Sequence, residues 1–344
     1  IVGGGRSPAD VVDVLDASGL RGLGGAGFPV ARKWRAVAAR PAPRLMVVNA
    51  DEGEPGTFKD RFCLESDPHR VLEGALIAAW ATGCDEIYLY LRDEYAGVRR
   101  RLERELARLA GDAFFAPLAR VHLRRGAGAY VCGEESALIE SIEGRRGMPR
   151  QRPPYVAERG LFGRPTLVNN VETLYWVPEI LARGAHWFAG QGRRGRKGLR
   201  MFSVSGRVRE PGVKLAPAGI TLRELVDEHC GGMAPGHELH AYLPGGASGG
   251  ILPASLADLP LDFDTLAPHG AFIGSAAVIV LSRHDDVHGA VRNLMGFFRG
   301  ESCGQCTPCR VGTAKAAALL EQPVWDAGLL EALSATMADA SICG

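Results

Sequence analysis

Three cysteines lie close together near the end of the chain, in the stretch ESCGQCTPC at 301–309. Cys303, Cys306 and Cys309 each stand two residues from the next, a spacing that lets neighbouring thiolates turn inward around one centre. Four thiolates complete either a tetrahedral zinc site or a [4Fe–4S] cluster. Because Cys343 is the only cysteine farther along the chain, we expect it to be the fourth ligand.

The arrangement of these cysteines bears on the metal. Zinc sites usually pair two Cys-x-x-Cys units, or one such unit with two histidines. Three closely spaced cysteines with a distant fourth favour an iron–sulfur cluster, with zinc and free thiols as the alternatives. The segment before Cys343 must then fold back toward the other three. The remaining cysteines are isolated and are expected to be small buried side chains: Cys63, Cys84, Cys132 and Cys230.

A glycine-rich loop, GLRGLGGAGFP at 19–29, contains a G-x-G-x-x-G pattern at Gly22, Gly24 and Gly27. Bare backbone amides before a helix can approach a phosphate, and Lys33 lies one helical turn inside that helix. The pattern is not a dinucleotide fingerprint, because a helix rather than a strand precedes it. The alternative is a flexible turn.

Acidic side chains follow two predicted strands. Asp51, Glu52 and Glu54 come directly after the strand at 44–50, where open α/β sheets bind ligands. Carboxylates there suit ribose hydroxyls or a flavin edge, with a solvated loop as the alternative. A second glycine-rich turn, 126–135, ends in two glutamates that a helix N-terminus favours even without function. Asn169 and Asn170 can cap a helix or bind a phosphate.

The elements that must position these residues form three units. Strands alternate with helices up to about residue 195, which predicts an α/β unit with a largely parallel sheet. A hairpin, a capped helix starting at Thr221 and a strand over 271–281 predict a small α+β unit at 196–284. Residues 285–344 are expected to be helical, with the cysteine run between two helices.

Composition limits the classes of function. A net charge of +1 over 344 residues gives no electrostatic sign of a nucleic acid or anionic membrane partner. Apolar runs are too short for a transmembrane segment. Cysteines grouped in one tight set favour a reducing compartment, so we expect the cytoplasm, free or on the cytoplasmic face of a membrane complex.

Five stretches together resemble one family: GLRGLGGAGFP, NADEGEPGTFKDR, RGAGAYVCGEESAL, PTLVNNVET and ESCGQCTPCR. They are similar to the flavin-bearing, NADH-oxidising subunit of respiratory complex I and to its soluble relatives, the diaphorase (beta) subunits of NAD-reducing hydrogenases and NAD-dependent formate dehydrogenases. The resemblance covers nearly the whole chain. It implies an FMN-binding Rossmann-like domain (1–195), a ubiquitin-like β-grasp domain (196–284) and a helical bundle with a [4Fe–4S] cluster (285–344).

The resemblance also implies roles for particular residues. FMN is expected to contact a set drawn from both glycine-rich loops, the helix after the first loop, the strand at 44–50 with the loop after it, and the stretch 166–181: Gly22, Gly24, Gly25, Lys33, Asn49, Asp51, Glu52, Tyr130, Gly133, Glu134, Glu135, Asn169, Asn170 and Thr173. NAD(H) is expected to contact Arg21, Gly27, Phe28, Lys33, Glu54, Glu135, Arg152 and Tyr155. In the family pattern a Lys stands in place of Arg152 and a Phe in place of Tyr155. Glu135 is the residue expected to tune the flavin potential, and no acid–base catalyst is expected.

The implied activity is exchange of a hydride between NAD(H) and FMN and of single electrons between FMN and the cluster. Expected partners are a small thioredoxin-like [2Fe–2S] subunit and a larger iron–sulfur or catalytic subunit. A gap between Cys309 and Cys343 shorter than the complex I pattern leans the assignment toward a soluble formate dehydrogenase or hydrogenase. Two alternatives are a zinc-stapled docking scaffold and a subunit of a membrane ferredoxin:NAD oxidoreductase.

Overall fold

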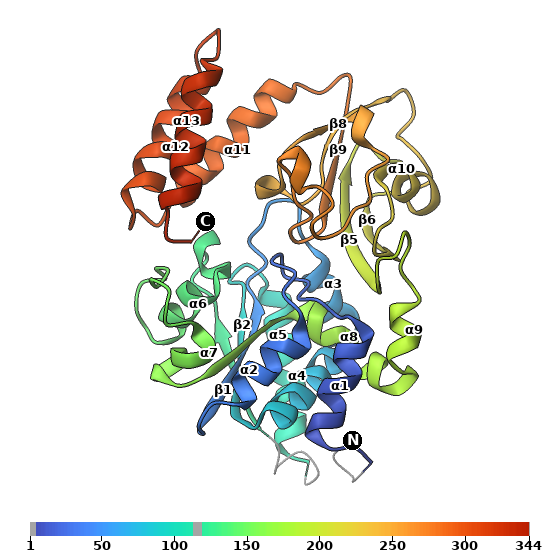
Figure 1. The fold of residues 1–344 in the computed structure, drawn as a ribbon, viewed down its shortest axis with the longest axis vertical. Helices are drawn as coiled ribbons and strands as arrows, with labels where there is room; N and C mark the ends of the chain where they lie inside the picture. Colours follow the sequence, from blue (N-terminus) through green and yellow to red (C-terminus); the bar gives the residue numbers. More distant parts are fainter. Residues whose placement is uncertain (1–4, 113–118, 344) are drawn as a thin grey trace.

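The computed structural model describes residues 5–112 and 119–343, and it divides into three parts (Figure 1). An α/β unit contains the elements from α1 to α9. A mixed-sheet unit contains β5 to β9, and a helical unit contains α11 to α13. The mixed-sheet and helical units lie side by side above the α/β unit in this view. The predicted boundaries at 195/196 and 284/285 stay predictions.

The sheet of the α/β unit has four parallel strands in the order β3-β2-β1-β4. In its centre, Asn49 pairs with Tyr90 on one side and with Asn170 on the other, so the polar ends of β1 and β4 are neighbours. The strands are β1 (Arg44–Ala50), β2 (Cys84–Leu91), β3 (Arg120–Arg125) and β4 (Thr166–Asn170).

Both faces of the sheet are mostly buried at β1, β2 and β4, as is usual for parallel sheets, whereas the edge strand β3 is partly exposed. Met46 and Val48 of β1 belong to the large core under the longer helices, whereas Leu45 and Val47 face a smaller core under the short ones. The helices on the large-core side are α1 (Pro8–Ser18), α2 (Val30–Ala38), α3 (Lys59–Ser66), α4 (Pro68–Thr82), α5 (Ala96–Ala110), α8 (Val171–Arg183) and α9 (Ala185–Ala189). The other side carries η1 (Tyr130–Gly133), α6 (Glu135–Ile142), α7 (Val156–Arg159) and η2 (Leu161–Gly163).

The start and end of α1 follow from its sequence. The Ser7 side chain accepts from the backbone of Asp10, whose own carboxylate accepts from the Ser7 backbone, and Pro8 takes the first helical position. Gly19 ends the helix in the left-handed region. The glycine-rich loop therefore leaves α1 at a fixed angle and leads into α2.

The mixed-sheet unit has five strands in the order β6-β5-β9-β7-β8, with β5 and β9 parallel and the other pairs antiparallel. The prediction of one strand over 271–281 is wrong in its first half, because Gly274 and Ala276 have positive φ and interrupt extended backbone. The elements are β5 (Leu199–Gly206), β6 (Gly212–Pro217), α10 (Leu222–Glu224), η3 (Leu225–His229), β7 (Leu239–Leu243), η4 (Ala247–Gly249), β8 (Leu252–Pro253), η5 (Ala254–Leu256), η6 (Ala267–His269) and β9 (Ala277–Ser282).

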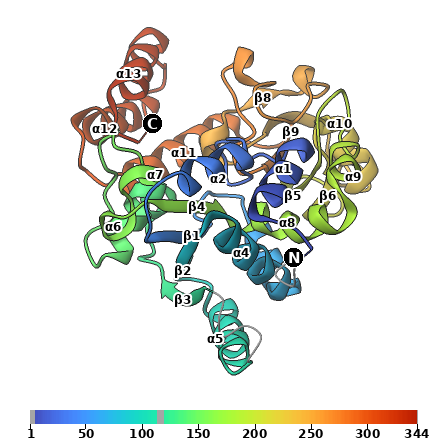
Figure 2. The same ribbon diagram turned by 60° about the horizontal axis from the view of Figure 1, so that its bottom comes forward.

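The helical unit contains α11 (Val287–Glu301), α12 (Thr307–Leu320) and α13 (Ala327–Ala340). Cys303 and Cys306 lie between α11 and α12, as predicted, whereas Cys309 lies in the first turn of α12. Figure 2 shows this unit at one edge of the molecule and α5 projecting at another. None of the helices among residues 5–112 and 119–343 is long and apolar enough to span a membrane.

Candidate functional site

One cavity of about 590 Å³ lies where the three units meet, at the carboxyl ends of β1 and β4. This volume falls within the range of about 300–1,000 Å³ that is usual for bound cofactors. Residues predicted from sequence line much of it: Gly24, Gly25, Asn49, Asp51, Glu52, Glu54, Tyr130, Gly133, Glu134, Asn170, Cys303, Cys306, Cys309 and Cys343.

The glycine-rich loop presents bare backbone to this cavity. Its turn is closed by hydrogen bonds between Gly22 and Phe28 (2.8 Å) and from the Gly27 amide to the Gly22 carbonyl (3.2 Å). A Cβ atom on Gly24 would lie 2.8 Å from the Cβ of Asn170, closer than packed carbons approach. The Leu23 amide donates to the Thr173 hydroxyl at 2.9 Å and holds the loop on α8.

Asp51 carries a polar atom that lacks a partner. Its side chain is only 8% exposed, and no hydrogen-bond partner for Oδ2 is found in the described part of the chain. Burial raises the pKa of Asp51 to about 7, against the attraction of Arg92 and with a small further rise from Glu94. The carboxyl faces the cavity and can exchange a proton near neutral pH.

This shift predicts how stability depends on pH. Between about pH 4 and pH 7 the folded chain keeps the Asp51 proton that the unfolded chain has released, so this residue's contribution to stability falls as pH rises. Between about pH 5 and pH 7.5, the unfolding free energy of Asp51→Asn should fall less than that of the wild type. We expect the difference between the two proteins to be about 1–2 kcal/mol. Urea unfolding at a series of pH values measures it. An unchanged pH dependence of the unfolding free energy in Asp51→Asn would contradict the assignment.

A buried ion network underlies the floor of the cavity. Lys59, 1% exposed, contacts Asp60 and Glu172 at 2.9 Å each. Although burial lowers the pKa of Lys59, the surrounding carboxylates raise it above its usual value. Glu52 accepts from the amides of Asp60 (2.8 Å) and Arg61 (3.0 Å). Burial and the charge of Asp60 raise the pKa of Glu52 to about 7.

Two members of this network, Lys59 and Asp60, line the cavity but were not singled out from the sequence. Asp60 accepts from the Asn170 side chain at 2.6 Å, which connects the network to the end of β4. Their signal was the pair of opposite charges at the start of a helix, directly after the acidic loop. No comparable sequence signal marks the cavity residues of the mixed-sheet unit: Ser248, Phe272, Gly274 and Ser275.

Tyr130 lies at the junction of all three units. Its hydroxyl donates to Glu54 at 2.6 Å, and Glu54 also accepts from the amide of Ser248 at 2.7 Å. Its backbone amide donates to Glu301 of α11 at 3.0 Å. The Tyr130 ring meets Phe297 edge to face, with centroids 5.2 Å apart. This turn therefore ties the acidic loop to both upper units.

The second glycine-rich turn leads into α6 as predicted. Glu134 caps the helix by accepting from the amides of Ser136 and Ala137, and it pairs with Arg152. Glu135 lies 3.4 Å from the Lys33 ammonium and 3.9 Å from Arg152. Lys33 and Arg152 therefore surround the two glutamates with positive charge.

Several residues predicted for the site lie outside the cavity lining. Asn169 accepts from the Trp34 indole at 2.9 Å, and Thr173 holds the glycine-rich loop. Phe28 and Tyr155 are exposed on the surface, 42% and 56% respectively. The remaining predicted residues outside the lining are Arg21, Gly22, Gly27, Lys33, Glu135 and Arg152. Their roles stay predictions.

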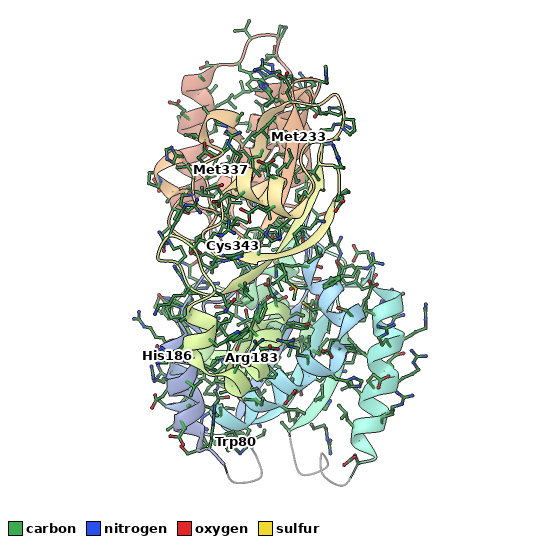
Figure 3. The ribbon with its side chains drawn as sticks, turned by 90° about the vertical axis from the view of Figure 1, so that its right-hand side faces the viewer. Trp80, Arg183, His186, Met233, Met337 and Cys343 are labelled. Carbon is green, nitrogen blue, oxygen red and sulfur yellow. The ribbon has the colours of Figure 1, made fainter. Side chains whose placement is uncertain are left out.

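The four cysteines of the predicted cluster line the same cavity, and Figure 3 shows Cys343 at the level where the upper units meet the α/β unit. Burial raises the pKa of Cys343 to about 11, and the other three cysteines and Glu134 add to this rise. Although burial opposes it, hydrogen bonds from Ile342, Cys309 and Ser341 lower the pKa of Cys306.

The four thiols that line this cavity suit a [4Fe–4S] cluster. In a [4Fe–4S] cluster each thiolate binds a different iron, so four sulfurs around a shared cavity suit it without converging on one point. The bare Gly24 backbone and the unpartnered Asp51 oxygen fit a polar cofactor such as FMN.

Comparisons with known proteins agree with this geometry. Residues 15–179 match the family model of the Nuo51 FMN-binding domain, 201–252 match the SLBB domain, and 289–344 match the NADH-ubiquinone oxidoreductase-F iron-sulfur binding region. The chain is 43% identical to the NADH-quinone oxidoreductase F subunit 2 of Rhizobium meliloti (strain 1021), over 96% of this chain and 81% of that protein. It is 44% identical to the corresponding F subunit of Rhodobacter capsulatus, over 91% of this chain and 75% of that protein.

The chain belongs to the family of NADH-quinone oxidoreductase F subunits. It is also similar to a chain of an NAD+-reducing [NiFe]-hydrogenase in the H2-reduced state, with a TM-score of 0.89 and 41% identity over 98% of this chain. The chain spans 59% of the length of that hydrogenase chain. Membership of this family confirms the predicted fold class, the FMN-binding domain and the iron–sulfur region, and it favours the cluster over zinc.

Proposed function

We propose that this chain is the NADH-oxidising FMN and iron–sulfur module of a larger redox assembly. The observation that carries the proposal is the single cavity shared by the glycine-rich loop, the acidic loop and the four cysteines. A hydride donor, a flavin and a cluster placed there would be close neighbours. When bound, FMN accepts two electrons at once from NADH and passes them on singly, which a cluster requires.

The chain's own residues bind and orient the cofactors in this proposal. Gly24 and Gly25 would offer backbone amides to the flavin phosphate, and Asn170 lies next to them. Asp51 and Asn49 would hold the ring side of a bound flavin, where the Asp51 carboxyl could hold or release a proton. The other FMN and NAD(H) contacts are those that the family resemblance implies, with Glu54 and Glu135 placed toward the nucleotide.

One substitution tests the role of the glycine-rich loop. We expect Gly24→Ala to weaken FMN binding by about tenfold or more, because the added methyl group displaces Asn170 and overpacking costs about 1–3 kcal/mol. Flavin retained after gel filtration and fluorescence titration with FMN measure the loss. Gly97→Ala is the matched control, since an added Cβ at this position of α5 has nothing within 4 Å. Equal FMN affinity in the two variants would contradict the proposed contact.

The partners and the compartment are part of the proposal. The related F subunits belong to NADH-quinone oxidoreductases, and the similar structure is an NAD+-reducing hydrogenase. We infer a thioredoxin-like [2Fe–2S] subunit and a larger iron–sulfur or catalytic subunit as partners, at the cytoplasmic side. The formate dehydrogenase assignment has no support from these relatives and stays a prediction.

An anaerobically prepared sample tests the function directly. It should show flavin absorbance, about four irons per chain and NADH–ferricyanide activity. Zinc without flavin, measured by elemental analysis and spectroscopy, would refute the proposal. Rapid mixing with NADH separates it from a ferredoxin-linked subunit, which should leave the flavin oxidised.

A further inference from the structure

A second, smaller cavity of about 180 Å³ lies away from the main one, between the start of the glycine-rich loop and the strand β5. It includes the end of the basic run GQGRRGRKG (190–198), which the proposed function does not use. Gly19, Leu20, Arg21 and Leu23 of the glycine-rich loop line one side of it. Its charged lining residues are Arg21, Arg196, Lys197, Arg200 and Asp262.

Positive charge exceeds negative charge in this pocket. Arg200 pairs with Asp262, and Arg196 lies 3.8 Å from the same carboxylate. No hydrogen bond or ion pair of the Lys197 ammonium is found in the described ranges. Arg21 is already neutralised by Asp264 at 2.8 Å. Three cations therefore share one carboxylate.

The neighbouring arginines of the same run do not show this imbalance. Arg193 contacts Glu228 at 2.7 Å and Arg194 contacts Glu224 at 2.7 Å. These ion pairs lie outside the pocket lining. Surplus positive charge is thus confined to the part of the run that faces the cavity.

Arg200 supplies the decisive detail. The residue is 4% exposed, and no hydrogen-bond partner for its Nε is found within the described part of the chain. Its guanidinium lies over the Phe263 ring at 4.0 Å. Burial lowers the pKa of Arg200 in spite of Asp262 and Glu172, and Glu172 is bound to Lys59. A buried N–H donor without an acceptor costs about 1–3 kcal/mol, more for a charged group, which an anion in the cavity would relieve.

We propose that this pocket binds a small oxyanion through Arg196, Lys197 and Arg200, with a phosphate group as the ligand. Guanidinium forks and an ammonium group are the donors that phosphate oxygens prefer. The cavity is smaller than the roughly 300–1,000 Å³ of a drug-sized ligand, so only the phosphate itself is enclosed. The inference does not depend on the proposed function.

Occupancy of this pocket would act on the main site through the shared loop. Leu20 and Leu23 line the pocket, and Gly24 and Gly25, the next residues along the loop, line the main cavity. A phosphate bound in the small pocket would therefore stabilise the conformation of the glycine-rich loop that lines the main cavity.

Calorimetric titration of the full chain, with its flavin and cluster bound, tests the inference. Inorganic phosphate is the probe, added at constant ionic strength set by sodium chloride. We expect one saturable site, weakened about tenfold or more by Lys197→Glu. Lys315→Glu, the same change on the exposed side of α12, should bind phosphate like the wild type. Retained flavin absorbance shows that each variant is folded.

The outcomes separate the sources of the phosphate. Competition by methyl phosphate supports an esterified phosphate that belongs to a larger metabolite, and absence of competition supports the free ion. If Lys197→Glu loses its flavin, Arg196→Gln replaces it with the same expectation. No saturable binding to the wild type, or equal binding by the pocket and control variants, would overturn the assignment.

Discussion

Replacing Cys306 by alanine should abolish cluster assembly and electron delivery to distant acceptors while NADH still reduces the flavin. Cys306 is one of the four thiols that line the cavity. Although burial opposes it, hydrogen bonds lower the pKa of this thiol, which favours the thiolate that binds iron. We expect iron to fall from about four per chain to nearly none. Reduction of long-range acceptors should fall by more than about a hundredfold, since even residues that only support metal ligands contribute about 10- to 100-fold.

Flavin reduction should survive because its expected contacts belong to the α/β unit, whose buried cores contain no residue of the helical unit within the described ranges. Stopped-flow bleaching of the flavin by NADH measures hydride transfer, and iron analysis measures cluster assembly. Cys84→Ala, a buried cysteine at the start of β2, is the matched control and should keep both. Loss of flavin reduction in a folded Cys306→Ala protein would show that flavin reduction depends on the cluster, which contradicts the prediction.

Lys59→Met should destabilise the chain by about 3–5 kcal/mol, because it leaves the buried carboxylates of Asp60 and Glu172 without their cation. This is a large share of the roughly 5–15 kcal/mol by which proteins are stable. Asp60 also accepts from Asn170, so the cavity edge should loosen together with the network. The shift in the urea unfolding midpoint measures the effect.

Two further variants make this prediction specific. Lys315→Met removes an exposed lysine and should change stability by no more than about 0.5 kcal/mol. The double variant Lys59→Met with Glu172→Gln should recover part of the loss, because it removes one of the two unpaired charges. A Lys59→Met protein as stable as the Lys315→Met control would show that the network contributes nothing.

The placement of the cysteines and of the loop after β1 at one cavity was predictable because the signals are local. The spacing of Cys303, Cys306 and Cys309 predicts that they act together, and the strand before the acidic loop predicts where that loop lies. Their roles as ligands stay predictions. The position of Cys343 beside the other three cysteines was predictable because no other cysteine follows them in the sequence. The α/β alternation likewise predicted the parallel sheet that brings Asn49 beside Asn170.

Other parts of the site were not predictable because they depend on how the units pack. Ser248 reaches the cavity only through the docking of the mixed-sheet unit on the acidic loop, a contact of residues 194 apart in sequence. The charge of Lys59 gave no indication of burial, since a buried lysine is recognisable only with its partners. The predicted strand over 271–281 failed for a backbone reason, the positive φ of Gly274 and Ala276.

The turn that carries Tyr130 is anchored on two sides, to Ser248 through Glu54 and to α11 through Glu301. Arg146, which follows α6, adds a separate contact between the α/β unit and the cysteine run by donating to the Cys303 carbonyl at 3.1 Å. These contacts restrict the range of distances between the flavin and the cluster that thermal motion samples. The rate of electron tunnelling falls steeply with that distance, so a narrow range of distances gives a narrow range of rates. We therefore expect electron transfer between the flavin and the cluster to follow a single exponential. Removal of the Glu301 contact with the Tyr130 amide should give a distribution of transfer rates instead.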